Sequence, residues 1–171
     1  MLLEELWLED YLKMGMVVGN NPSIQPGVVF DYSHCWLIHI GNNVTIAPEA
    51  YLLAHDASSK RLIGYTKIGR VVVEDDVFIG ARAIIMPNVT LGKGCIVAAG
   101  SVVTKSVAAG DVVAGNPAKV ISRVETYINK CQDQLGESRK YDHSYTIRGN
   151  ISMESKKQMI EELQNTNGFI R

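Results

Sequence analysis

Residues 73–108 read VEDDVF, IGARAI, IMPNVT, LGKGCI, VAAGSV and VTKSVA in blocks of six. An aliphatic residue opens each block: Val73, Ile79, Ile85, Leu91, Val97 and Val103. A small or medium residue stands four places after each of them: Val77, Ala83, Val89, Cys95, Ser101 and Val107. A helix repeats its faces about every 3.6 residues and a strand every two, so neither produces this period. A six-residue repeat with glycines predicts a β-helix, in which each block is one short strand plus a corner.

In such a fold each block forms one flat side of a prism. The opening aliphatic residue points inward, and the small residue four places later fits the crowded corner. Asparagine, aspartate and glycine suit the turns, as at Asp75, Asp76, Asn88 and Gly94. Three blocks, about 18 residues, close one circuit, whose strands hydrogen-bond to the circuits above and below.

Composition limits the classes of function. The 171 residues are enough for one domain with a sizeable core, and the net charge of -1 gives no electrostatic case for nucleic-acid binding. The cysteines Cys35, Cys95 and Cys131 are far apart and form no CxxC pair, so we expect neither disulfides nor a metal site. A reducing cytoplasm fits this pattern best. No apolar run approaches the roughly 20 residues of a membrane span.

The repeat is flanked and interrupted. Residues 1–20 are predicted to form a helical cap, because apolar residues recur there at helical spacing between acidic ones. These apolar residues are Leu2, Leu3, Leu6, Trp7 and Leu12. The β-helix is assigned to residues 21–121, beginning weakly at Ile24. Its register slips by two residues between Phe30 and Ile40, which predicts a bulge or irregular corner there.

A longer interruption lies between Leu52 and Val73, whose spacing is not a multiple of six. We expect an excursion over about residues 56–72. A loop that leaves a rigid solenoid is a frequent place for function, although a tolerated surface insertion would look the same in sequence.

The C-terminal part, residues 122–171, is predicted to be a helical extension. Residues 122–136 place apolar side chains on one helical face, and residues 152–164 form a second helix capped by Ser152. The final residues are expected to fray. Helices at both ends would cover the open edges of a β-helix.

His55, in LLAHD, is the strongest candidate for chemistry. An imidazole at neutral pH can take a proton from a hydroxyl or amine that attacks an acyl carbonyl. A histidine beside a loop is by itself more often a surface or packing residue. The position of His55 at the end of a repeat and directly before the excursion favours the catalytic interpretation.

Taken together, these motifs resemble the hexapeptide-repeat acetyltransferases, in the branch of sugar O-acetyltransferases and xenobiotic acetyltransferases. The resemblance is carried by IGNNVTIAP at 40–48, His55 with its loop, AAGSVVTK at 98–105 and AGNPAKVI at 114–121. It covers about residues 24–123. It implies an all-β solenoid with a left-handed parallel β-helix, acetyl-CoA as acyl donor, and a homotrimer with active sites between subunits.

The resemblance also implies roles for the acceptor side. His55 would be the general base that deprotonates the acceptor, which attacks the thioester directly without an acyl-enzyme. Asp31 matches an acidic position that helps to bind the acceptor or orients the imidazole. It could equally be an aspartate that only stabilises a turn. Tyr32 and Trp36 would offer a sugar-stacking face or would be packing residues.

On the donor side, the resemblance implies that the Ala81 N–H stabilises the oxyanion and that small residues lie under the pantetheine arm. The donor side also includes three basic residues, each of which would by itself be an ordinary surface charge: Lys105, Lys119 and Arg123. The predicted cofactor-binding residues are Ala81, Ala99, Gly100, Thr104, Lys105, Lys119 and Arg123.

The predicted acceptor is a hydroxyl of a sugar or polysaccharide precursor. N-acetylation of an amino sugar or of an antibiotic such as chloramphenicol would use the same base and donor. A γ-class carbonic anhydrase needs three converging histidines, and the spacing of His34, His39 and His55 does not match that family. A β-helix without catalysis is the remaining alternative.

Overall fold

The computed structural model describes residues 7–171, so the predicted helical positions Leu2, Leu3 and Leu6 lie outside the described part. The chain divides into two compact units, Met1–Val124 and Glu125–Arg171, which we describe separately. Among the described residues, no helix is both long and apolar enough to cross a membrane.

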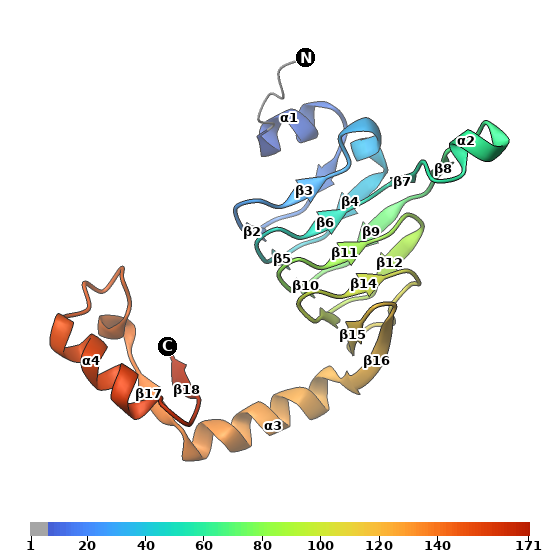
Figure 1. The fold of residues 1–171 in the computed structure, drawn as a ribbon. Coiled ribbons are helices and arrows are strands. Elements are labelled where there is room, and N and C mark those ends of the chain that lie inside the picture. Colours follow the sequence, from blue (N-terminus) through green and yellow to red (C-terminus); the bar gives the residue numbers. More distant parts are fainter. Residues whose placement is uncertain (1–6) are drawn as a thin grey trace. The chain divides into compact units, whose positions relative to one another are not determined.

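The first unit is built from three sheets of short parallel strands, which the chain visits in turn (Figure 1). The first sheet has the order β1-β4-β9-β12, the second β16-β15-β13-β10-β5-β2, and the third β14-β11-β6-β3. The strands of the early circuits are β1 (Val17–Val18), β2 (Ser23–Ile24), β3 (Val29–Phe30), β4 (Ile38–Ile40), β5 (Thr45–Ile46) and β6 (Tyr51–Leu52). The later ones are β9 (Val71–Val73), β10 (Phe78–Ile79), β11 (Ile84–Ile85), β12 (Val89–Leu91), β13 (Ile96–Val97) and β14 (Val102–Val103).

The six-residue period explains this arrangement. The aliphatic residues that open the blocks from Val73 to Val103 are at most 1% exposed, which confirms their predicted inward direction. Each strand pairs in register with its equivalent one circuit away, so that Phe78 lies between Thr45 and Ile96. The corners require glycine where circuits approach closely. A Cβ on Gly80 would lie 2.4 Å from the Ala99 nitrogen.

The two breaks in the period carry structure of their own. The two-residue slip is occupied by the 3-10 helix η1 (Tyr32–Leu37). The longer break contains β7 (His55–Asp56), the short helix α2 (Lys60–Ile63) and β8 (Lys67–Ile68), with β7 and β8 antiparallel. This hairpin is shorter than the predicted excursion of residues 56–72, because β9 has already rejoined the first sheet at Val71.

The two ends of the first unit differ. At the start, helix α1 (Leu8–Lys13) buries Tyr11 against Phe30, with ring centroids 5.4 Å apart. At the other end, β15 (Asp111–Gly115) and β16 (Ala118–Arg123) form an antiparallel pair. Residues 122 and 123 were predicted to be helical but belong to β16, because its pairing with β15 continues to Arg123.

The second unit contains the two predicted helices together with short strands that the sequence did not predict. Its elements are α3 (Val124–Glu137), β17 (Arg139–Tyr141), the 3-10 helix η2 (His143–Tyr145), α4 (Met153–Glu162) and β18 (Gly168–Ile170). The prediction that the last residues fray is wrong, because β18 pairs with β17 in parallel. The predicted cap is confirmed: Ser152 Oγ accepts a hydrogen bond from the Ser155 N–H at 3.0 Å.

Candidate active site

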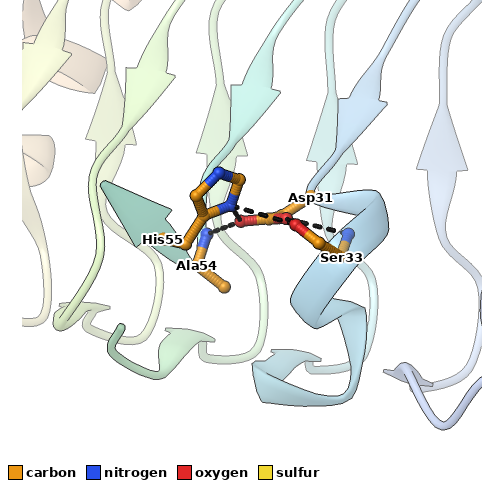
Figure 2. Close-up of polar contacts among 4 residues, drawn as sticks. All are labelled: Asp31, Ser33, Ala54 and His55. Carbon is orange, nitrogen blue, oxygen red and sulfur yellow. Dashed lines mark hydrogen bonds and ion pairs between the residues drawn. The ribbon is translucent and has the colours of Figure 1, made fainter. Parts of the chain in front are cut away.

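Asp31 and His55 come together from neighbouring circuits. Asp31 follows β3 and His55 follows β6, two strands that pair side by side in the third sheet. The Asp31 N–H donates to the Leu52 carbonyl oxygen at 2.9 Å and fixes the start of η1 at this place. His55 Nδ1 lies 2.5 Å from Asp31 Oδ2 (Figure 2). The sequence interruptions therefore bring the two predicted catalytic residues into direct contact.

The Asp31 carboxylate is buried and fully hydrogen-bonded. Its Oδ1 accepts from the Ser33 N–H at 3.1 Å and from Ser33 Oγ at 3.0 Å, and its Oδ2 accepts from the Ala54 N–H at 2.8 Å (Figure 2). Burial raises the pKa of Asp31, but the hydrogen bonds from His55, Ser33 and the Ala54 N–H together lower it below its usual value of 3.8. The carboxylate is therefore ionised at neutral pH.

An ionised carboxylate beside Nδ1 selects the histidine tautomer that carries its proton there. The His55 side chain is 35% exposed, whereas that of Asp31 is 1% exposed. The second ring nitrogen, Nε2, then keeps a lone pair that can accept a proton. This is the arrangement of a general base oriented by a buried acid.

A second imidazole stands next to this pair. The ring of His34 lies 5.4 Å from the ring of His55 and 5.4 Å from that of Trp36, measured between centroids. The sequence alone gave His34 no role beyond the carbonic anhydrase alternative. Tyr32 and Trp36, in the same turn, are 61% and 56% exposed. His39 is exposed on β4 and does not join the cluster of Asp31, His34 and His55 in residues 7–171.

A groove of about 530 Å³ brings together three of the predicted cofactor-binding residues, Ala81, Ala99 and Gly100. Pro48, Glu49 and Arg82 complete its lining. The Ala81 and Ala99 N–H groups form no hydrogen bond with another residue in the described part of the chain. The groove therefore offers backbone donors rather than reactive side chains.

Sequence reasoning missed Glu49 and Arg82, which form an ion pair of 2.6 Å on the groove. A signal was present: the groove consists of the third and fourth places of three stacked blocks. Glu49, Arg82 and Gly100 hold the fourth places and all have positive φ, at 60°, 59° and 69°. Such a backbone turns the chain sharply at each corner.

The remaining predicted cofactor residues do not line this groove. Thr104 and Lys105 are exposed after β14, and Lys119 is exposed on β16. The Arg123 guanidinium is paired with Asp111, with Nη1 2.5 Å from Oδ1. Arg123 thus holds the β15–β16 end of the sheet together, a role that the sequence pattern did not indicate.

The groove and the Asp31–His55 pair occupy different corners of the first unit. The groove lies where the second sheet passes to the third, before β6, whereas His55 follows β6. The extended segment from Glu49 to His55 places them on the order of 15–20 Å apart. One chain therefore presents two separate half-sites.

A comparison with known proteins identifies the type of repeat. A family model described as bacterial transferase hexapeptide (six repeats) matches residues 70–105. This part of the chain is a hexapeptide repeat of the transferase type. A 2,3,4,5-tetrahydropyridine-2,6-dicarboxylate N-acetyltransferase from Staphylococcus aureus (strain bovine RF122 / ET3-1) is 62% identical to it over 70 residues, 41% of this chain and 29% of that protein. This hexapeptide-repeat chain thus spans less than a third of the length of that curated relative.

Two solved structures resemble the hexapeptide-repeat chain over most of its length. A maltose O-acetyltransferase from Clostridium difficile 630 has 28% identity and a TM-score of 0.55, covering 68% of this chain and 74% of that one. A galactoside acetyltransferase in complex with coenzyme A has 28% identity and a TM-score of 0.54, covering 71% of both chains.

Proposed function

We propose that this protein transfers an acetyl group from acetyl-CoA to a hydroxyl of a sugar or polysaccharide precursor. The observation that carries the proposal is the Asp31–His55 contact, in which a buried carboxylate holds Nδ1 and leaves Nε2 free. In this proposal the three sheets form a left-handed parallel β-helix, as in the family that the sequence resembles. The free cysteines Cys35, Cys95 and Cys131 fit a cytoplasmic location.

The chemistry needs one base. His55 Nε2 takes the hydroxyl proton as the acceptor oxygen attacks the acetyl carbonyl of the thioester. The new C–O bond forms, the C–S bond breaks, and the departing CoA sulfur takes the proton back from the imidazolium. Asp31 stabilises that imidazolium and keeps the ring oriented. No acyl-enzyme is required.

The donor lies along the groove in this proposal. The Ala81 N–H, which has no partner among the described residues, donates to the developing oxyanion, and the Ala99 N–H donates to an amide carbonyl of the pantetheine arm. Gly100 leaves room for close approach. Thr104, Lys105 and Lys119 serve the nucleotide end, where the two lysines attract the phosphates. Arg123 was predicted to join them, but its guanidinium is already paired with Asp111.

The separation of the two half-sites supports a homotrimer. His55 and the groove of one chain are too far apart to act on the same thioester, so the His55 corner of one subunit must meet the groove of another. Contacts between unlike surfaces generate closed rings when the rotation closes. A ring of three such contacts would be a homotrimer with an active site at each interface, as the sequence resemblance implies.

A sugar acceptor is supported by the exposed aromatic faces of Tyr32 and Trp36 on η1, which suit a sugar ring. The base itself does not separate a hydroxyl from an amine, because either acceptor loses a proton during transfer. N-acetyl transfer is the second candidate, because the Staphylococcus aureus relative is an N-acetyltransferase with 62% identity over 70 residues.

The test follows CoA release from acetyl-CoA with a panel of sugars, amino sugars, chloramphenicol and tetrahydropyridine dicarboxylate. Release with a neutral sugar, and a product that hydroxylamine cleaves as an ester, would support O-acetylation. Release with amines alone would favour the second candidate. Acetyl-CoA binding without any release would refute these acceptor classes, and absence of binding would favour a β-helix without catalysis.

A further inference from the structure

His34 carries a polar atom without a partner. Its Nδ1 is buried, and no other described residue forms a hydrogen bond with it. A buried polar atom normally finds a partner, because leaving it without one costs free energy. The Asp31–His55 pair does not use His34, so the base arrangement alone leaves this nitrogen unexplained.

The neighbours of His34 are metal-ligand types at suitable distances. Asp31, His34 and His55 each offer one ligand atom, and these atoms lie within 4.8 Å of one another. A four-coordinate Zn²⁺ holds nitrogen and oxygen ligands at about 2.0–2.2 Å, so two of its ligand atoms lie about 3.4 Å apart. The Asp31–His55 contact of 2.5 Å would widen by about 1 Å, and the ligand atom of His34 would move inward by at most about 1.4 Å.

We propose that Asp31, His34 and His55 form a binding site for a divalent first-row transition metal ion, with Zn²⁺ the best match. Two imidazoles and one carboxylate, with water in the fourth position, are a donor set that Zn²⁺ accepts readily. Mg²⁺ and Ca²⁺ prefer oxygen ligands and are poor competitors here. The hydrogen bonds from Ser33 and Ala54 hold Asp31 in place for the ion.

The ion takes the position of the proton between Asp31 Oδ2 and His55 Nδ1. His55 then donates its Nδ1 lone pair to the metal and carries its proton on Nε2. His34 Nδ1 supplies the third lone pair. No electrons are transferred, and the only covalent change is the shift of the His55 proton between ring nitrogens.

This exchange makes the metal an inhibitor. With a proton on Nε2, His55 has no lone pair to accept the hydroxyl proton of the acceptor. The inhibition rests on the proposed function, because it assumes that His55 is the base. The binding does not, because it depends only on the three ligands.

The experiment titrates tag-free full-length protein with Co²⁺ and follows the visible absorption of the bound ion, with Zn²⁺ competition and Mg²⁺ as a negative control. We expect one site per chain. His34→Gln should weaken binding by at least about 10-fold, since even outer-shell partners of metal ligands contribute that much. His39→Gln, which changes an exposed histidine outside the cluster, should bind as the wild type does. No saturable binding, or equal binding by His34→Gln, would overturn the proposal.

A measurement on the wild type covers the case in which His34→Gln does not fold. Zn²⁺ should shift the imidazole ¹⁵N resonances of His34 and His55 and leave those of His39 and His143 unchanged. An unmoved His34 resonance would also overturn the site. Acetyl transfer that continues at saturating Zn²⁺, with both resonances shifted, would leave the metal site standing and refute His55 as the base.

Discussion

The His55 corner and the groove corner of the first unit are built in opposite ways. The groove comes from regular repeats and offers mainly backbone: the N–H groups of Ala81 and Ala99 beside Gly100. The His55 corner comes from two breaks in the repeat and offers side chains, Asp31 before η1 and His55 at the start of β7. Regular stacking thus makes a surface for a long ligand, and departures from it make room for acid–base chemistry.

The largest effect on activity is expected from a variant that removes the imidazole of the His55 corner. His55→Ala should reduce turnover by at least about 100-fold, the usual range for loss of a general base. His55 also pairs with the buried Asp31 carboxylate, so the melting temperature should fall, and the rates are compared at a temperature where the variant is folded. Steady-state CoA release measures the rate, and His39→Ala is the matched control. Acceptor-dependent release at the wild-type rate in His55→Ala would exclude the base role.

The second prediction concerns the carboxylate behind the base. Asp31→Asn should lower the free energy of unfolding by about 3 kcal/mol at neutral pH, since the bonds to a buried charged group are lost. The folded pKa of Asp31 lies below 3.8, so its contribution is fully present above that pH and disappears as the pH falls through the lowered pKa.

Denaturant unfolding of both proteins from pH 7 to pH 2 measures this difference. The stability gap between wild type and Asp31→Asn should be constant above pH 5 or so and should shrink in acid. Asp133→Asn, an exposed change in the second unit, should leave the curve unaltered. A gap that widens in acid would contradict the pKa direction.

The third prediction concerns a variant that disturbs the packing of the groove corner. Gly80→Ala should cost about 2 kcal/mol of stability, because its Cβ would collide with the backbone at Ala99. Gly94→Ala separates collision from backbone strain, since Gly94 has φ +63° but open space around it. It should cost only about 1 kcal/mol. Equal losses for both variants in chemical denaturation would show that close packing at Gly80 is unimportant.

The smallest effect is expected at the nucleotide end. Lys119→Ala should raise the KM for acetyl-CoA roughly 2- to 5-fold with kcat unchanged, the range for one exposed charge interaction. The effect should fade as salt is added. Lys156→Ala in α4 is the control with no expected change. A loss of kcat instead would assign Lys119 a role beyond attracting phosphate.

The sequence predicted the regular part well because the six-residue period maps one-to-one onto strands. It indicated which residues point inward and where the period breaks, whereas it left Asp31 open between a site residue and a turn aspartate. It could not predict that the chain reverses at Ala118–Arg123, since no repeat describes an antiparallel end. The position of His34 beside His55 could not be predicted either, because it depends on the exact path of η1 rather than on the spacing of residues in the sequence.

The second unit was harder to predict for a similar reason. The capping serine of α4 is a local signal and was found, whereas β17 and β18 pair across more than 20 residues of sequence. Three-residue strands have no periodicity to detect. Long-range pairing of this kind follows from tertiary packing and leaves little trace in composition.

The antiparallel end has a consequence for how the molecule could be remade. β15 is parallel to β13 on one side and antiparallel to β16 on the other, so it stops the repeat while satisfying its own edge. An additional circuit inserted ahead of Asp111 could pair in parallel with the circuit before it and with β15 after it, as β13 and β15 pair now. The length of the stack is therefore an adjustable dimension, and the distance from the His55 corner to the far end of the donor groove could be set by insertion.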